Sequence, residues 1–167
     1  MILVIDVDYN DKHQGHAAGI IADNTYSNKE LGYVTAIINN VEEYQAGKFY
    51  KRELRCIEAI LSRLDKSEID TIIVDGYADF GTEQLSLGNH VYNEYNIPVI
   101  GIAKNWYINC LVDNTEIYRG NSQKALYITS KGITLQKAKY LVRKMAGKHR
   151  LPYLVKLADS ICRDWNK

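Results

Sequence analysis

Cysteine and proline are scarce in this chain, with three and two residues respectively among 167. The cysteines, Cys56, Cys110 and Cys162, lie far apart and form no Cys-x-x-Cys pair. An odd number of widely spaced cysteines argues against a disulfide framework and against a zinc site. This pattern favours a reducing compartment.

Long apolar runs are missing as well. The first residues, MILVIDVDYN, have no basic segment before them and are too short for a signal peptide or a membrane span. No other stretch approaches the roughly 18 apolar residues of a membrane helix. We therefore expect a cytoplasmic protein with no membrane partner, and its length fits a single domain over residues 1–167.

The net charge is close to zero because two unequal parts cancel. Residues 131–167 contain ten Lys or Arg and two Asp or Glu, a net charge of +8, whereas residues 1–130 carry −7. A basic end beside an acidic body suits a protein that binds phosphates with one part and cations with the other. A pair of solvated basic helices would give the same pattern.

Hydrophobic periodicity predicts the order of the elements. Alternating or fully apolar short runs indicate strands, and apolar spacings of three and four indicate helices. Strands are predicted at residues 2–9, 17–23, 31–39, 70–76, 98–104, 116–120 and 124–130, and helices at residues 49–64, 84–95, 134–145 and 152–165. In the first strand, one face carries Leu3, Ile5 and Val7, and the other carries Ile2, Val4, Asp6 and Asp8. The last two strands are expected to form an edge hairpin, and Thr134 is expected to cap the third helix. Three early strands indicate an antiparallel meander, and the later strand–helix–strand order indicates parallel crossovers.

The expected fold class is therefore α/β. Its mixed sheet combines an antiparallel three-strand meander with parallel strands, and helices flank the sheet. This order resembles the ribonuclease H-like arrangement, in which acidic residues gather at the centre of the sheet.

Charged residues lie at the edges of apolar segments that are far apart in the chain. They are Asp6 in the first strand, Glu53 beside the apolar stripe of the first helix, Asp75 after TIIV, Lys104 after VIGIA, and Asp159 near the buried edge of the last helix. Each alone has an ordinary explanation, such as a turn before glycine or a long side chain that reaches solvent.

Together, these five residues predict an ion site. Carboxylates that converge on one point repel one another unless a divalent cation lies among them. Ligands that are all oxygen favour Mg²⁺, with Mn²⁺ as a substitute, over zinc. Such an ion activates water and stabilises charge on a phosphate, and a nearby lysine assists. The predicted ligands are Asp6, Glu53, Asp75 and Asp159, with Lys104 as a further catalytic residue.

With these residues in view, the chain resembles the endonuclease V family of deoxyinosine 3′-endonucleases. Five segments are similar, in order, to motifs of that family: IDVDY with Asp6, Tyr44 through Arg52-Glu53, Val74-Asp75-Gly76, Gly101-Ile-Ala-Lys104, and Arg150-Leu-Pro with LAD up to Asp159. The resemblance is colinear over nearly the whole chain. It implies metal-ligand roles for the carboxylates and a strand-separating wedge at Tyr44.

Nucleic acid is the partner that this reading implies. Gly47, Gly76 and Gly88 are expected where the backbone approaches a base that is turned out of its strand into a pocket. The residues expected at the phosphates are basic and lie near the C-terminus: Lys131, Lys137, Lys139, Lys144, Lys148 and Arg150.

The departures from the family's pattern concern the substrate rather than the metal. Glu43 and Ala46 replace the two prolines beside the wedge position, and YADFGTEQLSLG follows Asp75-Gly76 where the family has a stretch with His-Pro-Arg. Ser130-Lys131-Gly132 replaces a Gly-His. We expect a complete metal centre with an altered substrate-reading surface.

The expected activity, as the resemblance implies, is Mg²⁺-dependent hydrolysis of a phosphodiester one nucleotide 3′ to a deaminated, hypoxanthine-containing base in DNA or RNA. The missing His-Pro-Arg stretch leaves open a ribonuclease H-like nuclease with another nucleic-acid substrate. A third reading is a non-catalytic nucleic-acid-binding relative, against which the five retained site residues argue.

Overall fold

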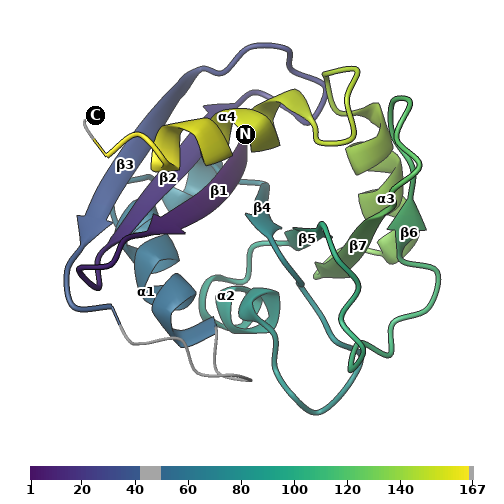
Figure 1. The fold of residues 1–167 in the computed structure, drawn as a ribbon, viewed down its shortest axis with the longest axis horizontal. Helices are drawn as coiled ribbons and strands as arrows, with labels where there is room; N and C mark the ends of the chain where they lie inside the picture. Colours follow the sequence, from purple (N-terminus) through teal and green to yellow (C-terminus); the bar gives the residue numbers. More distant parts are fainter. Residues whose placement is uncertain (42–49, 166–167) are drawn as a thin grey trace.

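One mixed sheet organises the chain. The computed structural model describes residues 1–41 and 50–165, and its seven-stranded sheet has the order β3-β2-β1-β4-β5-β7-β6 (Figure 1). The strands are β1 (Ile2–Tyr9), β2 (Gly15–Ala22), β3 (Gly32–Ile38), β4 (Thr71–Asp75), β5 (Val99–Ala103), β6 (Glu116–Ile117) and β7 (Leu126–Lys131).

The strand directions confirm the predicted mixed sheet. β1, β2 and β3 form the antiparallel meander, and β4 runs parallel to both β1 and β5. β7 is antiparallel to β5 and forms the expected hairpin with the edge strand β6. In the register of β1 and β4, Ile5 lies beside Val74. The next residues of these two parallel strands, Asp6 and Asp75, therefore lie at the same edge of the sheet.

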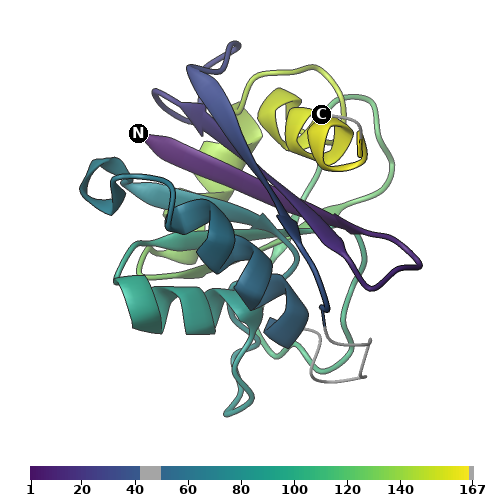
Figure 2. The same cartoon turned by 90° about the vertical axis from the view of Figure 1, so that its left-hand side faces the viewer.

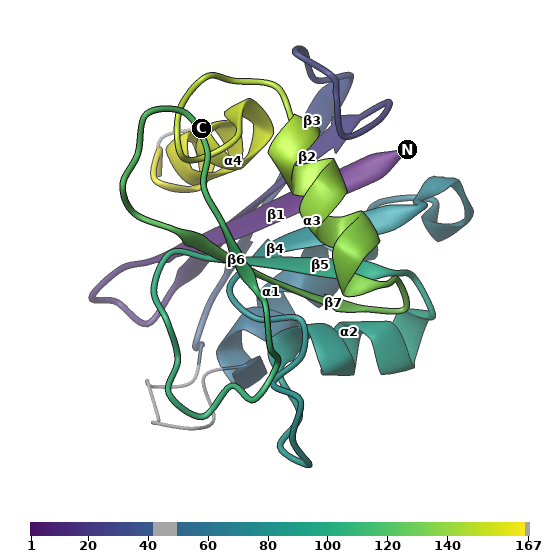
Figure 3. The same ribbon diagram turned by 90° about the vertical axis from the view of Figure 1, so that its right-hand side faces the viewer.

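Helices cover both faces of the sheet. α1 (Tyr50–Leu61) and α2 (Leu87–Tyr95) lie on one face, and α3 (Leu135–Lys144) and α4 (Tyr153–Cys162) lie on the other (Figures 2 and 3). α4 packs on β1 and β2, and α3 packs on β7. A short 3₁₀ turn, Lys66–Glu68, precedes β4. None of the helices in the described residues has the length and apolar character of a membrane span.

The alternation of side chains along β1 divides the core into two layers. Ile2 and Val4 belong to the layer beneath α3 and α4, whereas Leu3 and Ile5 belong to the layer beneath α1 and α2. Since successive side chains of a strand point to opposite faces, Asp6 continues the face of Ile2 and Val4. The predicted division of the first strand into two faces is confirmed.

Several helix boundaries differ from the apolar pattern. α2 begins at Leu87 rather than at residue 84 because Ser86 caps it: the Ser86 hydroxyl accepts from the Asn89 N–H at 3.3 Å, and the Asn89 side chain accepts from the Ser86 N–H at 2.9 Å. α1 ends at Leu61 rather than 64, and α4 ends at Cys162 rather than 165. Thr134 caps α3 as predicted.

The absence of a side chain at Gly101 lets the segment after β4 pass directly over β5. A Cβ atom at Gly101 would lie 2.4 Å from the Ala78 nitrogen and 2.5 Å from the Gly76 carbonyl oxygen. The Ala78 N–H also donates to the Thr129 hydroxyl on β7 at 2.8 Å. The path of the backbone that follows Asp75 therefore depends on this glycine.

We expect Gly101→Ala to lower the free energy of unfolding by roughly 1–3 kcal/mol, the range for overpacked interior sites. Gly32→Ala on β3 is the matched control, because a Cβ there meets no atom within 4 Å, and it should be neutral or slightly stabilising. Chemical denaturation measures both variants. Equal changes in the two would contradict the close approach at Gly101.

Candidate active site

The carboxyl ends of adjacent parallel strands carry the predicted charged residues. Asp6 lies in β1, Asp75 ends β4, and Lys104 directly follows β5. Parallel strands present their carboxyl ends at one edge, where α/β proteins usually bind ligands. Glu53 comes from the first turn of α1 and Asp159 from α4, so the two reach this edge from opposite faces of the sheet.

Three of the four predicted metal ligands line one small cavity at this edge. Asp6, Glu53 and Asp75 contribute to its lining together with apolar side chains that include Ile57 and Leu87. Its volume is about 10 Å³, which is roughly the space of a single water-sized sphere. Residues that are widely separated in the sequence therefore line the same small cavity.

Two ion pairs hold three of the five predicted residues. Lys104 Nζ donates to Asp75 Oδ2 at 2.7 Å, and Asp159 Oδ1 accepts from Arg163 Nε at 3.0 Å. Asp159 acts on the cavity through its charge, which raises the pKa of Asp6. Burial opposes the positive charge of Lys104, but the hydrogen bond and charge of Asp75 outweigh it and raise the pKa of the ammonium.

The electrostatics of the cavity favour protonated carboxyls when no cation is bound. Burial raises the pKa of Asp6 to about 7, and the negative charge of Asp75 acts in the same direction. Burial, followed by the charge of Asp75, raises the pKa of Glu53 well above its ordinary value, against the opposing charge of Arg52. Both shifts have the cause expected of like charges gathered in a poorly solvated place.

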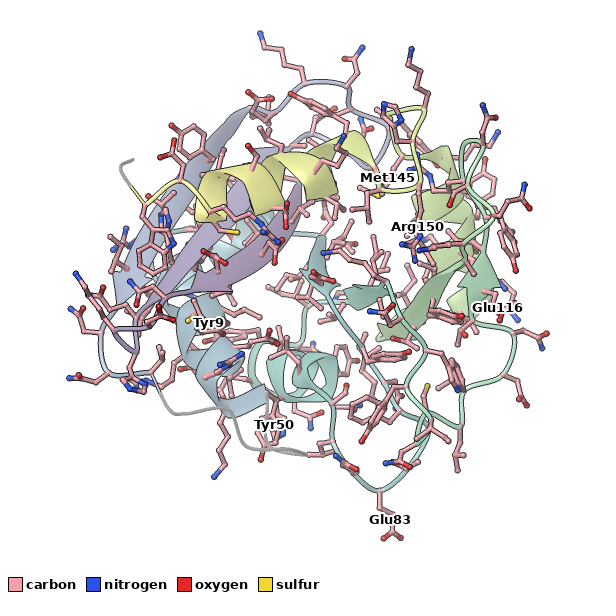
Figure 4. The ribbon with its side chains drawn as sticks, viewed as in Figure 1. Tyr9, Tyr50, Glu83, Glu116, Met145 and Arg150 are labelled. Atoms are coloured by element: carbon pink, nitrogen blue, oxygen red, sulfur yellow. The ribbon has the colours of Figure 1, made fainter. Side chains whose placement is uncertain are left out.

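Arg52, which precedes Glu53 on α1, packs on Tyr9 at the end of β1. The Arg52 guanidinium lies 3.9 Å from the centre of the Tyr9 ring, a cation–π geometry. Figure 4 shows Tyr9 at the end of β1 and Tyr50 at the start of α1 on the same side of the molecule. The charge of the arginine that precedes Glu53 favours the ionised form of this carboxyl.

By its chemistry, this donor set fits a hard divalent cation, because every donor is a carboxylate oxygen. The side chains are not preassembled around one: within residues 1–41 and 50–165, no three His, Cys, Asp or Glu side chains lie close enough to form a ready-made metal site. The ammonium of Lys104 forms an ion pair with the Asp75 carboxylate instead. A cation would therefore displace protons from Asp6 and Glu53 and loosen the contact with Lys104.

A second, larger cavity adjoins the first and shares Glu53 and Asp75 with it. Its volume is about 260 Å³. Aromatic rings form much of its wall: Tyr50, Tyr77, Phe80 and Tyr107. The ring centres of Phe80 and Tyr107 are 5.0 Å apart, and those of Tyr77 and Phe80 are 5.6 Å apart.

Sequence reasoning did not identify these aromatic wall residues. Tyr77 and Phe80 belong to the stretch YADF that departs from the family's His-Pro-Arg, so the departure itself was the available signal. Tyr107 comes from the segment after β5, and only the tertiary structure brings it to the other two rings.

The predicted base-contacting glycines differ in their surroundings. Gly76 lines the larger cavity with φ +120°, and a Cβ there would meet nothing within 4 Å. A side chain at that φ would be strained, so glycine keeps this wall open. Gly88 is buried in α2, where a Cβ would lie 2.4 Å from the Ala78 Cα. The close packing of α2 on the backbone at Ala78 therefore explains the glycine at position 88. Gly47 and the wedge candidate Tyr44 lie outside the described residues.

The basic C-terminal residues also divide into groups. Lys137, Lys144 and Lys148 are exposed. Lys131 pairs with Asp79 at 3.6 Å, and Lys139 donates to the Asn114 carbonyl. The ammonium groups of the three exposed lysines are accessible to a phosphate. Their role in phosphate binding stays a prediction.

Arg150 lies between α3 and α4 (Figure 4), and its side chain forms hydrogen bonds with backbone carbonyls. Its guanidinium donates to the Lys104 carbonyl and, at 2.6 Å, to the Ala125 carbonyl. Arg119, which sequence reasoning missed, is 7% exposed and donates to four carbonyls of residues 145–150, among them His149 at 3.0 Å. Two arginines therefore fix the segment that anchors Lys104.

The Endonuclease V family model matches residues 1–131. The chain belongs to the endonuclease V family. A comparison with curated proteins finds no match. Among solved structures, endonuclease V from Streptomyces avermitilis is similar with a TM-score of 0.76 and 22% identity, over 97% of this chain and 79% of that one.

Two further structures of the endonuclease V family are similar in fold. The catalytic domain of human endonuclease V has a TM-score of 0.81 and 17% identity, over 98% of this chain and 80% of that one. Ciona intestinalis endonuclease V, in complex with DNA that contains an inosine followed by a ribo-adenosine, has a TM-score of 0.80 and 16% identity, over 97% and 83%. The predicted ribonuclease H-like fold and the predicted family are both confirmed.

Asp6 is expected to make the metal-free protein less stable as the pH rises. A carboxyl whose pKa is higher in the folded chain binds more protons there, so the free energy of unfolding falls with pH between the two pKa values. For Asp6 this window runs from 3.8 to about 7. Because the asparagine of Asp6→Asn cannot ionise, this variant should lack that fall in the free energy of unfolding, which is on the order of 4 kcal/mol at most.

Thermal denaturation in EDTA at about pH 5 and about pH 8 measures this effect. Glu58→Gln, an exposed position on α1, is the control and should keep the pH dependence of the wild type. The same fall in stability with pH in Asp6→Asn and in the wild type would contradict the role of Asp6.

Arg150 is expected to act through position rather than through a phosphate. Arg150→Lys leaves a carbonyl without its donor and should lower the free energy of unfolding by about 1–3 kcal/mol. It should leave the salt dependence of nucleic-acid binding unchanged. Neutralising Lys144 and Lys148 together should instead flatten the slope of log affinity against log salt by roughly one unit for each phosphate that is no longer bound.

Binding titrations over a series of salt concentrations separate the two roles. A flatter slope in Arg150→Lys would show that the guanidinium contacts phosphate, and an unchanged slope in the double lysine variant would show that those lysines only solvate the helix end.

Proposed function

We propose that this member of the endonuclease V family is a Mg²⁺-dependent endonuclease that hydrolyses a phosphodiester 3′ to a deaminated, hypoxanthine-containing base. The observation that carries the proposal is the convergence of Asp6, Glu53 and Asp75 on one cavity beside Lys104. A nuclease of this family with an oxygen-only acidic site at the sheet edge has the chemistry that phosphate transfer requires.

The carboxylates have distinct parts in this proposal. Asp6, Glu53 and Asp75 hold the cation, and Asp159 adds negative charge from α4. When bound, Mg²⁺ supplies Lewis-acid stabilisation of the phosphate and a more acidic water. Asp6, whose pKa is about 7 without a cation, would give up its proton on ligation and so be available as a carboxylate ligand near neutral pH.

Lys104 supplies positive charge next to this acidic cluster. Its ammonium pairs with Asp75 at 2.7 Å, and ligation of Asp75 to a cation would free the ammonium for a phosphate oxygen. A fixed positive charge stabilises the negative charge that develops during cleavage. The anchored backbone at Lys104 limits how far the side chain moves.

The larger cavity is the proposed receptor for the target base. It shares Glu53 and Asp75 with the acidic site, its aromatic walls suit a flat ring, and Gly76 leaves the backbone accessible. The inosine-containing DNA in the complex of the Ciona intestinalis relative supports a deaminated base as the ligand.

A nuclease with another substrate is the second candidate. The observation that favours it is the aromatic wall formed by Tyr77 and Phe80, in the stretch that replaces the family's His-Pro-Arg. An apolar wall discriminates weakly between bases that differ in one polar group. This alternative predicts cleavage of nucleic acid without a requirement for inosine.

Cleavage of matched oligonucleotides with and without one inosine, in Mg²⁺ and in EDTA, tests the proposal. We expect cleavage that requires both inosine and Mg²⁺. Glu53→Gln should lower the rate at least about 100-fold, because a direct ligand matters no less than the groups that orient ligands. Glu58→Gln lies on the exposed side of the same helix and should cleave as the wild type does.

The outcomes separate the candidates. Equal cleavage of both oligonucleotides in Mg²⁺ would favour the nuclease with another substrate. Full activity in EDTA, or in Glu53→Gln, would contradict the metal site, and no cleavage of any nucleic acid would leave a binding protein.

A further inference from the structure

The segment after β5 begins at Lys104 of the acidic site and exposes three apolar side chains. Trp106 is 48% exposed, Ile108 82% and Leu111 69%. Of the three, Trp106 lies nearest to Lys104 in the chain, and an exposed indole so close to a charged site is a candidate for a binding surface. Trp106, Ile108 and Leu111 line neither the acidic cavity nor the aromatic cavity, so these two cavities do not explain why the three side chains are exposed.

This segment is fastened to the loop that follows β4. The Tyr77 hydroxyl accepts from the Tyr107 N–H at 2.8 Å and donates to the Asn105 carbonyl at 2.9 Å. Burial raises the pKa of Tyr77 to about 12, so the hydroxyl keeps its proton at physiological pH. The Leu111 N–H donates to the Phe80 carbonyl at 2.7 Å. The exposed side chains therefore stand on a fixed backbone.

Trp106 itself rests on a neighbouring strand. Its ring lies 5.5 Å from the ring of Tyr127 on β7, at an angle of 52°, which is a tilted aromatic contact. Nearly half of the tryptophan surface remains open to solvent. An indole that contacts one ring and keeps about half of its surface in solvent can accept a second flat ring.

The position of Trp106 relates it to the strand that would be cleaved. It lies two residues after Lys104, whose ammonium pairs with Asp75 at the acidic site. In proteins that bind unpaired strands, cationic side chains bind the phosphates and nearby aromatic rings stack on the bases. Lys104 and Trp106 supply such a cation and such a ring from the same short segment.

We propose that the exposed indole of Trp106 is a stacking site for an unpaired nucleobase of the strand whose phosphate lies at Asp75 and Lys104. The inference rests on the proposed function, since it places that strand at the acidic site. Stacking on the open face favours nucleic acid whose bases are unpaired next to the cleavage position. A protein partner at the same exposed surface is the competing occupant.

Binding of single-stranded oligothymidylate in EDTA tests the stacking site without cleavage. Trp106→Ala should weaken binding by roughly 5- to 150-fold, the range for loss of one stacked base. It should not weaken binding of a base-free sugar-phosphate chain of the same length. Trp106→Phe should keep most of the affinity. Tyr33→Ala, at an exposed tyrosine on β3 near the other sheet edge, should bind as the wild type does.

Fluorescence provides a second readout. The chain has two tryptophans, so that in Trp165→Phe the emission comes from Trp106 alone. Oligothymidylate should quench this emission, and the base-free chain should not. This measurement remains informative if Trp106→Ala fails to fold.

The inference is overturned if Trp106→Ala weakens binding of both chains equally, or if oligothymidylate leaves the Trp106 emission unchanged. Normal inosine cleavage with either of these results would remove the stacking site and keep the proposed function. Quenching of the Trp106 emission without any cleavage in Mg²⁺ would keep the stacking site and remove the proposed function. A wild type that binds neither chain would overturn the stacking site and favour the protein partner, and the cleavage assay would then decide the proposed function on its own.

Discussion

The gathering of carboxylates where the pairing of β1 with β4 ends is the constraint on which the rest of the site depends. Poor solvation and, after it, mutual repulsion raise the pKa of Asp6 and of Glu53, and the ion pair of Lys104 with Asp75 compensates part of the negative charge. Such a cluster weakens a fold that gains nothing from it. In the proposed function, the cluster binds a cation next to a phosphate, which would offset this cost.

The surrounding fold holds this cluster from several directions. Gly101 lets the backbone after Asp75 cross β5, and Arg150 binds the carbonyl of Lys104. Arg119 in turn fixes the residues around Arg150. Long-range hydrogen bonds from the buried Arg119 and the half-buried Arg150 are costly to break because the carbonyls would lose their partners. The acidic site is therefore supported by residues that do not touch it.

The aromatic surroundings give this member of the endonuclease V family a wall suited to flat rings. Tyr77, Phe80 and Tyr107 form a packed group beside the acidic cavity, and Trp106, which precedes Tyr107 in the chain, is half exposed. Rings of this kind bind flat bases through stacking, with little dependence on which base is present. In the proposed function, the acidic site and the aromatic surface divide the work between bond cleavage and the placement of the strand.

The sequence by itself determined the mixed sheet, its two apolar faces and the candidate carboxylates, because alternation along β1 and the apolar runs of β4 and β5 are local patterns. It also determined the cap of α3 at Thr134. Only the tertiary structure decided that Asp6 and Asp75 are neighbours, since that follows from the pairing of β1 with β4. It also decided that Arg150 binds backbone and that Tyr107 joins Tyr77, because contacts between residues about 30 or more positions apart leave no periodic trace in one sequence.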